Sequence, residues 1–301
     1  MVSISVRNIS KSFKKVQALD QISFEVAQGE LFGLIGPDGA GKTTLFRILT
    51  TLLVADEGSA SVFGFDVIDG MNDIRNSVGY MPGKFSLYQD LTVEENLTFF
   101  ATIFDTTVAE NYHLIEDIYV QIEPFKNRRA GALSGGMKQK LALCCALIHQ
   151  PKVLFLDEPT TGVDPVSRKE FWEMLKRLQQ KGITILVSTP YMDEAALCDR
   201  IALIQDGKIL DINSPEEIVA KHQHVIYDVK ASNPHQLISL LKAYPTAHSV
   251  YPFGEYVHYT DQSGEFKQED LHAYLAHNGL KEIVIQPTPA TIEDAFMELA
   301  N

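Results

Sequence analysis

A glycine-rich run that ends in lysine and threonine is the first group of residues able to do chemistry. It reads GPDGAGKT over residues 36–43 and fits the phosphate-loop pattern GxxxxGK[ST]. Glycines let backbone N–H groups close around phosphate oxygens, and a helix that begins at the loop adds partial positive charge. We expect Lys42 to reach the β- and γ-phosphates and the Thr43 hydroxyl to bind Mg²⁺. The run therefore predicts a nucleoside triphosphate site.

The nucleotide-binding residues expected in and beside this loop form one set. They are Gly36, Asp38, Gly39, Ala40, Gly41, Lys42, Thr43 and Thr44. We expect the carboxylate of Asp38 to turn away from the phosphates, so that the loop amides and Lys42 supply most of the phosphate contacts.

Two adjacent carboxylates form a second candidate group. Asp157 and Glu158 end a strand that is predicted to begin at Lys152, about 115 residues after the phosphate loop. One carboxylate at a strand end can hold the Mg²⁺ shell, and its neighbour can orient or deprotonate an attacking water. An Asp-Glu pair alone is more often a solvated strand end. Its position after a phosphate loop favours Asp157 as a metal ligand and Glu158 as the base.

Strands and helices must position these groups, and their sequence signals alternate from residue 1 to about 220. Short apolar runs, typical of buried parallel strands, lie at residues 31–35, 152–157 and 183–188. A helix is expected at residues 43–53, and further helices should begin after capping residues Thr92, Thr107 and Asp164. This order predicts an α/β domain with a mainly parallel sheet.

The composition limits the class of protein. A length of 301 residues suggests about two domains, and 45% apolar residues is ordinary for a globular chain. No apolar stretch approaches the roughly 18 residues needed to span a bilayer. The net charge of −13 argues against a nucleic-acid partner, which wants a basic face. Three cysteines without a CxxC pair predict buried, reduced thiols: Cys144, Cys145 and Cys198.

The order and spacing of four motifs carry a family resemblance. They are the phosphate loop, LSGGMKQK at residues 133–140, LDEP with its strand at 154–159, and Gly162-Val163-Asp164. The chain resembles the nucleotide-binding subunits of ABC transporters over roughly residues 1–220, and LSGGMKQK is highly specific. The resemblance implies an α/β fold of the P-loop NTPase type: an ABC-type nucleotide-binding domain with a helical subdomain, spanning residues 1–222.

The composition shifts at His222-Gln223-His224, and a second set of short elements follows. Strand, helix, hairpin, helix and strand are expected at residues 225–230, 234–243, 249–260, 268–277 and 282–286, with a last helix at 291–299. A β-α-β-β-α-β order predicts a small α+β, ferredoxin-like domain over residues 223–301. This tail also resembles the C-terminal extension of exporters of the drug or polysaccharide type. The two histidines could bind a metal, but a solvated interdomain linker is the more common explanation.

The resemblance implies roles for individual residues around ATP and Mg²⁺. Phe13 matches the aromatic that stacks on adenine, with a plain core phenylalanine as the alternative. Ser134, Gly135 and Gly136 match the signature groups that touch the γ-phosphate held by a second subunit, and Asp164 matches the loop that links the two sites. Residues 85–91 match the surface that receives the coupling helix of a membrane permease.

Two positions depart from the family pattern. The family has glutamine, which ligates Mg²⁺ and senses the γ-phosphate, where this chain has Gly83. It has histidine, which contacts the γ-phosphate, where this chain has Pro190, a residue with neither a side-chain donor nor an N–H. Lys84 and Tyr191 are the nearby side chains that could replace them. ATP binding should survive, because Lys42 and the loop amides supply most of the phosphate contacts. Losing one preorganised contact can cost about 10²–10³ in the rate of hydrolysis, but Glu158 remains, so the site need not be inactive.

The resulting prediction is an ATP-binding and ATP-hydrolysing subunit of an export-type ABC transporter. It should lie in the cytoplasm, peripheral on the inner face of the cell membrane, bound to an integral membrane permease subunit. We expect an asymmetric pair with a second nucleotide-binding subunit that retains its own glutamine and histidine. A homodimeric ATPase and a non-transport ABC protein that uses ATP as a clamp are the alternatives.

Overall fold

Buried apolar runs form the strands of the computed structural model, which describes residues 1–222, 224–263 and 266–300. The chain divides into two units, Met1–Pro215 and Glu216–Asn301. The boundary expected from the sequence adjoins residue 223, which lies outside the described residues. Each unit packs around a hydrophobic cluster of its own, so each is described separately.

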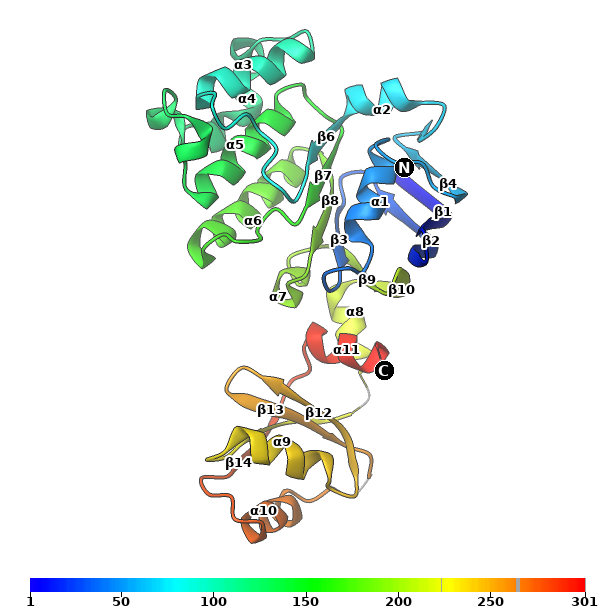
Figure 1. Ribbon diagram of the computed structural model, residues 1–301, viewed down its shortest axis with the longest axis vertical. Coiled ribbons are helices and arrows are strands. Elements are labelled where there is room, and N and C mark those ends of the chain that lie inside the picture. The colour runs from blue at the N-terminus through cyan, green and yellow to red at the C-terminus, as the bar shows by residue number, and fades with distance from the viewer. Residues whose placement is uncertain (223, 264–265, 301) are drawn as a thin grey trace. The chain divides into compact units, whose positions relative to one another are not determined.

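A six-stranded sheet forms the centre of the first unit (Figure 1). Its order is β10-β9-β3-β8-β7-β6, and every neighbouring pair is parallel except β10 with β9. The strands are β3 (Leu31–Ile35), β6 (Val78–Met81), β7 (Val153–Asp157), β8 (Thr184–Thr189), β9 (Arg200–Gln205) and β10 (Lys208–Asn213). All residues of β3, β7 and β8 are buried, which explains why their centres are continuous apolar runs rather than alternating ones, with polar residues only at the ends of β7 and β8.

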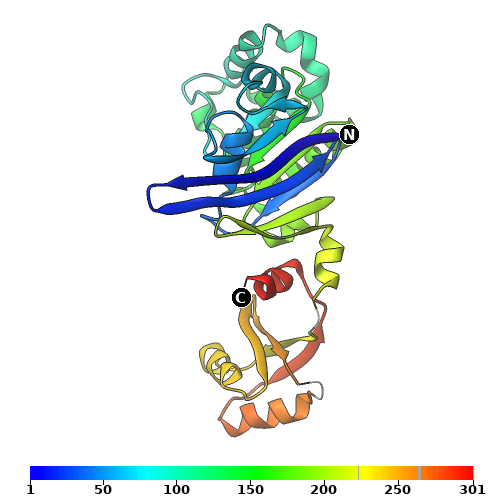
Figure 2. The same ribbon diagram turned by 90° about the vertical axis from the view of Figure 1, so that its right-hand side faces the viewer.

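A second, antiparallel sheet has the order β2-β1-β4-β5. Its strands are β1 (Val2–Phe13), β2 (Val16–Ala27), β4 (Glu57–Val62) and β5 (Phe65–Asp66). Figure 2 shows the long hairpin of β1 and β2, in dark blue, extending beyond the rest of this unit. Helix α1 (Lys42–Leu49) packs between the two sheets, where the Phe46 ring meets Phe155 of β7 edge-on at 5.9 Å.

Helix α1 is shorter than the sequence predicted. It was expected to reach residue 53 but ends at Leu49. The Thr50 hydroxyl donates a hydrogen bond to the carbonyl of Phe46, and Thr51 takes a left-handed backbone with φ 62°. A β-branched residue at positive φ cannot continue a helix, so the chain turns toward β4.

Capping residues fix the remaining helices of the first unit. Thr92 and Thr107 each form a complete capping box, and Asp164 caps a helix whose first residue is Pro165, as predicted. The helices are α2 (Met71–Ser77), α3 (Val93–Ile103), α4 (Val108–Tyr119), α5 (Gly135–Leu147), α6 (Pro165–Gln180) and α7 (Met192–Ala195), with short 3₁₀ turns at Glu123–Phe125 and Ala130–Ala132. Figure 1 shows α3, α4 and α5 gathered as a helical part beside β6 and β7.

The second unit has the expected order β-α-β-β-α-β, between a short helix α8 and a final helix α11. Its four strands form an antiparallel sheet in the order β12-β13-β11-β14. The elements are α8 (Pro215–Ala220), β11 (Ile226–Lys230), α9 (Pro234–Lys242), β12 (Ala247–Phe253), β13 (Tyr256–Asp261), α10 (Gln268–His277), β14 (Val284–Thr288) and α11 (Ile292–Leu299). The last strand begins two residues later than expected, after Glu282 with its left-handed φ of 54°.

Different helices cover the two faces of this small sheet. Val257 and Tyr259 of β13 lie in the apolar cluster with residues of α9 and α10. Successive side chains of a strand point to opposite faces, so His258 lies on the other face, where it contacts Asp294 of α11. Among the residues that the structure describes, no helix is long and apolar enough to cross a membrane.

Candidate functional site

The phosphate loop connects the end of β3 to the start of α1, as predicted. Two of its glycines are required by close approach. A Cβ on Gly36 would come within 2.0 Å of the carbonyl oxygen of Ile204, and one on Gly41 within 2.3 Å of that of Ala18, with φ 102°. Asp38 is exposed and Lys42 is buried, so the loop presents its lysine inward and this carboxylate outward.

Lys42 is surrounded by oxygen atoms. Its ammonium donates to the carbonyls of Gly36 at 2.7 Å and Pro37 at 2.9 Å, and it lies 3.2 Å from Oε1 of Glu158. The lysine is 3% exposed, while the side chain of Glu158 is 22% exposed. The fold thus brings together two residues that are 116 positions apart in the chain, as a phosphate-binding cation and a base require.

Asp157 is held between two hydroxyl groups. Thr43 donates to Oδ2 at 2.8 Å, and Ser188 of β8 donates to Oδ1 at 2.6 Å. A threonine hydroxyl and a carboxylate are hard oxygen ligands of the kind that Mg²⁺ prefers. The expected metal-binding pair therefore lies within hydrogen-bonding distance, and a Mg²⁺ ion there would help to neutralise charge on phosphate oxygens.

Glu158 has a strained backbone that Ser188 supports. Its φ is 49°, in the left-handed region that glutamate seldom adopts. Its N–H donates to both the carbonyl and the hydroxyl of Ser188, each at 3.1 Å. Residues held in this region cluster at functional sites, because the surrounding structure over-determines them. Sequence analysis missed Ser188, although its place at the end of a buried strand next to the Asp157 strand was a usable signal.

A buried carboxylate behind the site was also missed. Glu194 of α7 is 2% exposed and accepts hydrogen bonds from the hydroxyls of Thr160 at 2.7 Å and Thr189 at 2.5 Å. Thr160 follows Glu158 by two residues, and Thr189 precedes Pro190. Glu194 thereby ties together the two segments that follow β7 and β8. No sequence motif marks this contact, because the three residues meet only in the folded chain.

Gly83 lies directly against the carboxylate of Asp157. A Cβ at this position would stand 3.8 Å from Oδ2 of Asp157 and 3.1 Å from its carbonyl oxygen. A longer side chain at Gly83 would therefore reach the Thr43–Asp157 pair, and glycine offers none. Burial, together with the charge of Asp157 and partly offset by Arg47, raises the pKa of the neighbouring Tyr80 to about 12.

Pro190 begins the turn after β8, in the segment that Glu194 anchors. The ring of Tyr191, the next residue, is already engaged by another side chain. The guanidinium of Arg168 lies 4.5 Å from the centre of this ring. Lys84, the other candidate replacement, is exposed. The two departures from the family pattern thus lie at the ends of the strands that flank Asp157 and Glu158.

The signature residues lie at the N-terminus of α5. Ser134 caps this helix and is exposed, and Gly135 is exposed beside it. A Cβ on Gly136 would come within 2.7 Å of the hydroxyl of Ser167 in α6, so the two helices approach closely there. An exposed helix N-terminus is suited to bind an anion. The structure brings this segment together with the start of α6 that Asp164 caps, rather than with Lys42.

Phe13 ends β1 at the projecting hairpin and is 47% exposed. Packing in the core therefore does not account for this aromatic side chain. Lys11 lies with its ammonium 5.7 Å from the centre of the ring. An exposed ring of this kind remains available for stacking on a flat ligand.

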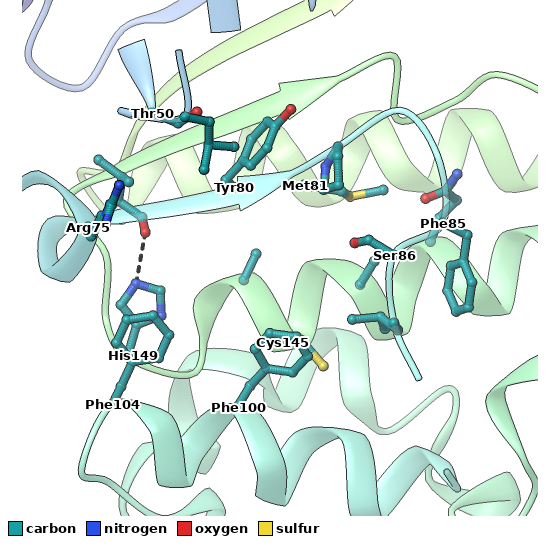
Figure 3. A pocket seen from close by; sticks show the side chains of 17 residues that line it. Thr50, Arg75, Tyr80, Met81, Phe85, Ser86, Phe100, Phe104, Cys145 and His149 are labelled. Atoms are coloured by element: carbon teal, nitrogen blue, oxygen red, sulfur yellow. Dashed lines mark hydrogen bonds between the residues drawn. The ribbon is translucent and has the colours of Figure 1, made fainter. Parts of the chain in front are cut away.

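An apolar hollow of about 260 Å³ lies between β6 and the helical part (Figure 3). Aromatic rings of Tyr80, Phe85, Phe100 and Phe104 line it. At one end of the hollow, the imidazole of His149 stacks on the ring of Phe104. Its Nε2 is hydrogen-bonded to the carbonyl oxygen of Val78 at 3.0 Å. The hollow includes the first residues of the segment 85–91 that sequence analysis assigned to a membrane partner.

Comparison with known proteins gives a consistent set of relatives. Residues 19–161 match the family model described as ABC transporter. The chain is 34% identical to the Nod factor export ATP-binding protein I of Rhizobium sp. (strain N33), over 100% of this chain and 97% of that protein. It is 41% identical over 220 residues to a probable multidrug ABC transporter ATP-binding protein, YbhF, of Escherichia coli (strain K12). That match covers 72% of this chain and 38% of the longer protein.

Solved structures give the same fold. The chain resembles cbiO1 of Clostridium perfringens, part of the ABC transporter complex cbiONQ, with a TM-score of 0.66 and 26% identity over 73% of this chain and 91% of that one. It also resembles a dimeric bacterial ABC transporter cassette, with a TM-score of 0.64 and 25% identity over 70% of this chain and 98% of that one. These matches confirm the P-loop NTPase fold that the sequence motifs predicted.

Proposed function

Because this chain belongs to the ATP-binding proteins of ABC transporters, we propose that it binds ATP with Mg²⁺ and hydrolyses it to drive export through a membrane permease. The relatives reported above are named for Nod factor export and for multidrug transport. The transported molecule should be set by the permease, so we assign none to this chain.

One observation carries the proposal: the catalytic side chains meet at the end of the parallel sheet. Lys42 lies 3.2 Å from Glu158, and Thr43 lies 2.8 Å from Asp157. In this arrangement Lys42 would bind the β- and γ-phosphates of ATP, and Thr43 and Asp157 would hold Mg²⁺. Glu158 would orient and deprotonate the water that attacks the γ-phosphorus, while the bond from that phosphorus to the β–γ bridging oxygen breaks and ADP leaves. The backbone N–H groups of the glycine-rich loop and of the start of α1 would hold the remaining phosphate oxygens.

The exposed position of Ser134 supports a dimer in which each ATP lies between two chains. Ser134, Gly135 and Gly136 of one subunit would complete the site formed by the phosphate loop of the other. Asp164, at the start of α6 beside the signature, would connect the two sites. Phe13 would stack on adenine, since its ring is exposed at the hairpin.

We further propose that the functional pair is asymmetric. Gly83 faces Asp157 without a side chain, and Pro190, directly after β8, offers no hydrogen-bond donor. Losing one preorganised contact to a transition state can cost about 10²–10³ in rate. This chain would then contribute a weak site of its own and an intact signature to the strong site of a second nucleotide-binding subunit.

The membrane partner is proposed to dock on the helical part of the first unit. The hollow beside Phe85 presents aromatic rings, and Tyr88 is 50% exposed next to it. An amphipathic helix from a permease would fit such a surface by burying its apolar face. Through this contact, the chain would attach peripherally to the cytoplasmic face of the membrane.

The test is ATP binding and turnover by the purified chain at high concentration, beside a Glu158→Gln variant. ATP binding with little Glu158-dependent turnover is the expected result. Turnover that is fast and vanishes in Glu158→Gln would contradict the asymmetric pair, because it would mean a competent homodimer. Failure to bind ATP would contradict the function itself. Copurification with a membrane permease separates a transporter subunit from an ATP-dependent clamp.

A further inference from the structure

We infer that the C-terminal unit carries a transition-metal site, of the class that Zn²⁺ occupies, formed by His224, His248 and Glu298. One ligand atom from each of the three side chains lies within 4.8 Å of the others. Imidazole nitrogen and carboxylate oxygen are both zinc ligands, and two histidines with one glutamate form an established three-ligand set. The inference is independent of the ATP chemistry, because every residue in it belongs to Glu216–Asn301.

Three separate segments bring the ligands together. His224 precedes β11, His248 lies in β12 and Glu298 lies in α11. The pairing of β12 with β13 shifts register between Ala247 and Ser249, so His248 occupies the irregular position. A bulge of this kind re-aims a side chain out of the ordinary alternation of the strand. Here the rings of His224 and His248 approach to 4.2 Å between their centres.

A neighbouring histidine positions the glutamate. Nε2 of His222 lies 3.2 Å from Oε2 of Glu298, and its Nδ1 lies 2.9 Å from the carbonyl oxygen of His224. The carbonyl and the ionised carboxylate both only accept hydrogen bonds, so His222 holds the two of them when each of its ring nitrogens carries a hydrogen. Carboxylates that bind metal ions are commonly hydrogen-bonded by outer partners of this kind. His222 is 4% exposed and thus held in place.

The surroundings leave room for an ion and its water. The four residues line a cavity of about 660 Å³, together with Asp294 and Lys242. His248 and Glu298 are exposed, so an ion can enter from solvent. Nitrogen and oxygen ligands about 2.0–2.1 Å from a tetrahedral zinc lie about 3.3 Å from one another, so ligand atoms that are up to 4.8 Å apart must close by up to about 1.5 Å. Because the charge of Lys242 opposes a cation, affinity should depend most on Glu298.

A bound ion would cross-link the start of this unit to its last helix. The ligands come from the segment before β11, from β12 and from α11. Without an ion, these three segments are held together by noncovalent contacts. An ion that binds the folded state alone stabilises it in proportion to its affinity and concentration. We therefore expect zinc to raise the unfolding temperature of the C-terminal unit without changing ATP binding.

The test is a titration of the metal-free full chain with Zn²⁺ against a chromogenic chelator, without nucleotide. One ion per chain is expected. Glu298→Gln and His248→Gln should each lower the affinity by at least about 100-fold, and His222→Gln by about 10- to 100-fold, as outer partners of metal ligands do. His272→Gln, on an exposed histidine of α10, is the matched control and should bind as the wild type does.

Cobalt substitution distinguishes a formed site from chance surface binding. Co²⁺ should give the visible absorption of a four-coordinate ion in the wild type and in His272→Gln, and lose it in His248→Gln. Far-UV circular dichroism and ATP binding check that the variants fold. Zinc binding that is equal in all the variants, or absent in the wild type, would overturn the inference, and neither result would bear on ATP hydrolysis.

Discussion

At the scale of single residues, Ser188 organises both carboxylates of the site. Its hydroxyl donates to Asp157 at 2.6 Å and accepts from the N–H of Glu158 at 3.1 Å. The same hydroxyl therefore orients the carboxylate proposed to bind Mg²⁺ and supports the left-handed backbone of Glu158, the proposed base. Ser188 touches neither substrate nor metal in this role, so it acts through its two neighbours.

Replacing Ser188 by alanine should weaken Mg²⁺-dependent ATP binding. Without the hydroxyl, Asp157 loses one of its two orienting partners, and outer partners of this kind are worth about 10- to 100-fold in metal affinity. The measurement is the Mg²⁺ concentration that gives half-maximal ATP binding. Ser188→Thr keeps the hydroxyl and should restore it. Equal Mg²⁺ requirements in the wild type and Ser188→Ala would show that Asp157 does not depend on this bond.

Gly83→Gln should raise ATP turnover by the chain. A glutamine there would begin 3.8 Å from Oδ2 of Asp157 and supply an oxygen to the metal side of the site. One preorganised contact is worth up to about 10²–10³ in rate, and we expect at least tenfold, because Pro190 remains. Phosphate release at saturating ATP measures the effect.

Lys84→Gln, the same residue one position later, is the control for Gly83→Gln and should leave turnover unchanged. If Gly83→Gln binds ATP as the wild type does but shows no gain, then the missing glutamine is not what limits this site. That result would point to Pro190 instead.

At the scale of elements, the last helix of the chain is attached to the small sheet by a buried polar cluster. His258 of β13 is 2% exposed and lies 2.6 Å from Asp294 in α11 and 3.1 Å from Asp228 in β11. Tyr251 also donates to Asp294, and Asp294 closes the capping box of α11 with Thr291. One carboxylate therefore serves the helix cap and the contact between helix and sheet together.

The pKa of Asp294 follows from these contacts. Burial raises it, but hydrogen bonds from His258, Thr291 and Tyr251 outweigh burial and lower it to about 2. A carboxyl group whose folded pKa is depressed stabilises the fold above its unfolded pKa, near 4, and loses that contribution as pH falls through 2. The shift corresponds to about 2 kcal/mol.

Asp294→Asn should destabilise the C-terminal unit by about 3–5 kcal/mol near neutral pH, because it leaves His258 and Tyr251 with a weaker partner in a buried position. The difference from the wild type should shrink between pH 4 and pH 2, where the wild type loses its own carboxylate. Urea unfolding followed by circular dichroism measures it. Glu293→Gln, on the exposed neighbour, is the control and should change little. A difference that is constant with pH would contradict the assigned role of the charge.

At the scale of the whole molecule, the proposed function pairs this chain with a second nucleotide-binding subunit, because the exposed Ser134 lies at the start of α5 and not beside Lys42. In an asymmetric pair, the two halves of this subunit contribute unequally. Its phosphate loop belongs to the weak site, while Ser134 at the start of α5 belongs to the strong site of the partner. This separation gives opposite expectations for two substitutions in the same chain.

In a reconstituted complex with a second nucleotide-binding subunit, Ser134→Arg in this chain should reduce ATP turnover by at least about 100-fold, since it blocks the strong site. Lys42→Ala in this chain should leave most of the turnover, since it removes only the weak site. Steady-state phosphate release by the complex is the measurement. An equal loss from both substitutions would rule out the asymmetric pair and favour two equivalent sites.

Sequence by itself determined the phosphate loop, the carboxylate pair, the signature and the α/β class, because local pattern carries each of them. A short stretch of sequence is enough to indicate a glycine at positive φ, a capping residue such as Thr92 or a buried strand with an apolar centre, because each of these is a local requirement. The helix caps at Thr107 and Asp164 were predicted correctly for the same reason. The end of α1 was predicted wrongly, because Thr51 has a left-handed backbone where the helix was expected to continue.

Only the tertiary structure decided which distant groups meet. Ser188 reaches Asp157 because β8 lies beside β7, and Glu194 joins Thr160 to Thr189 because α7 folds back on both strand ends. The histidine and glutamate cluster of the C-terminal unit likewise depends on a register shift in β12 and on the packing of α11. Such contacts arise from strand order and close packing, which no short stretch of residues encodes.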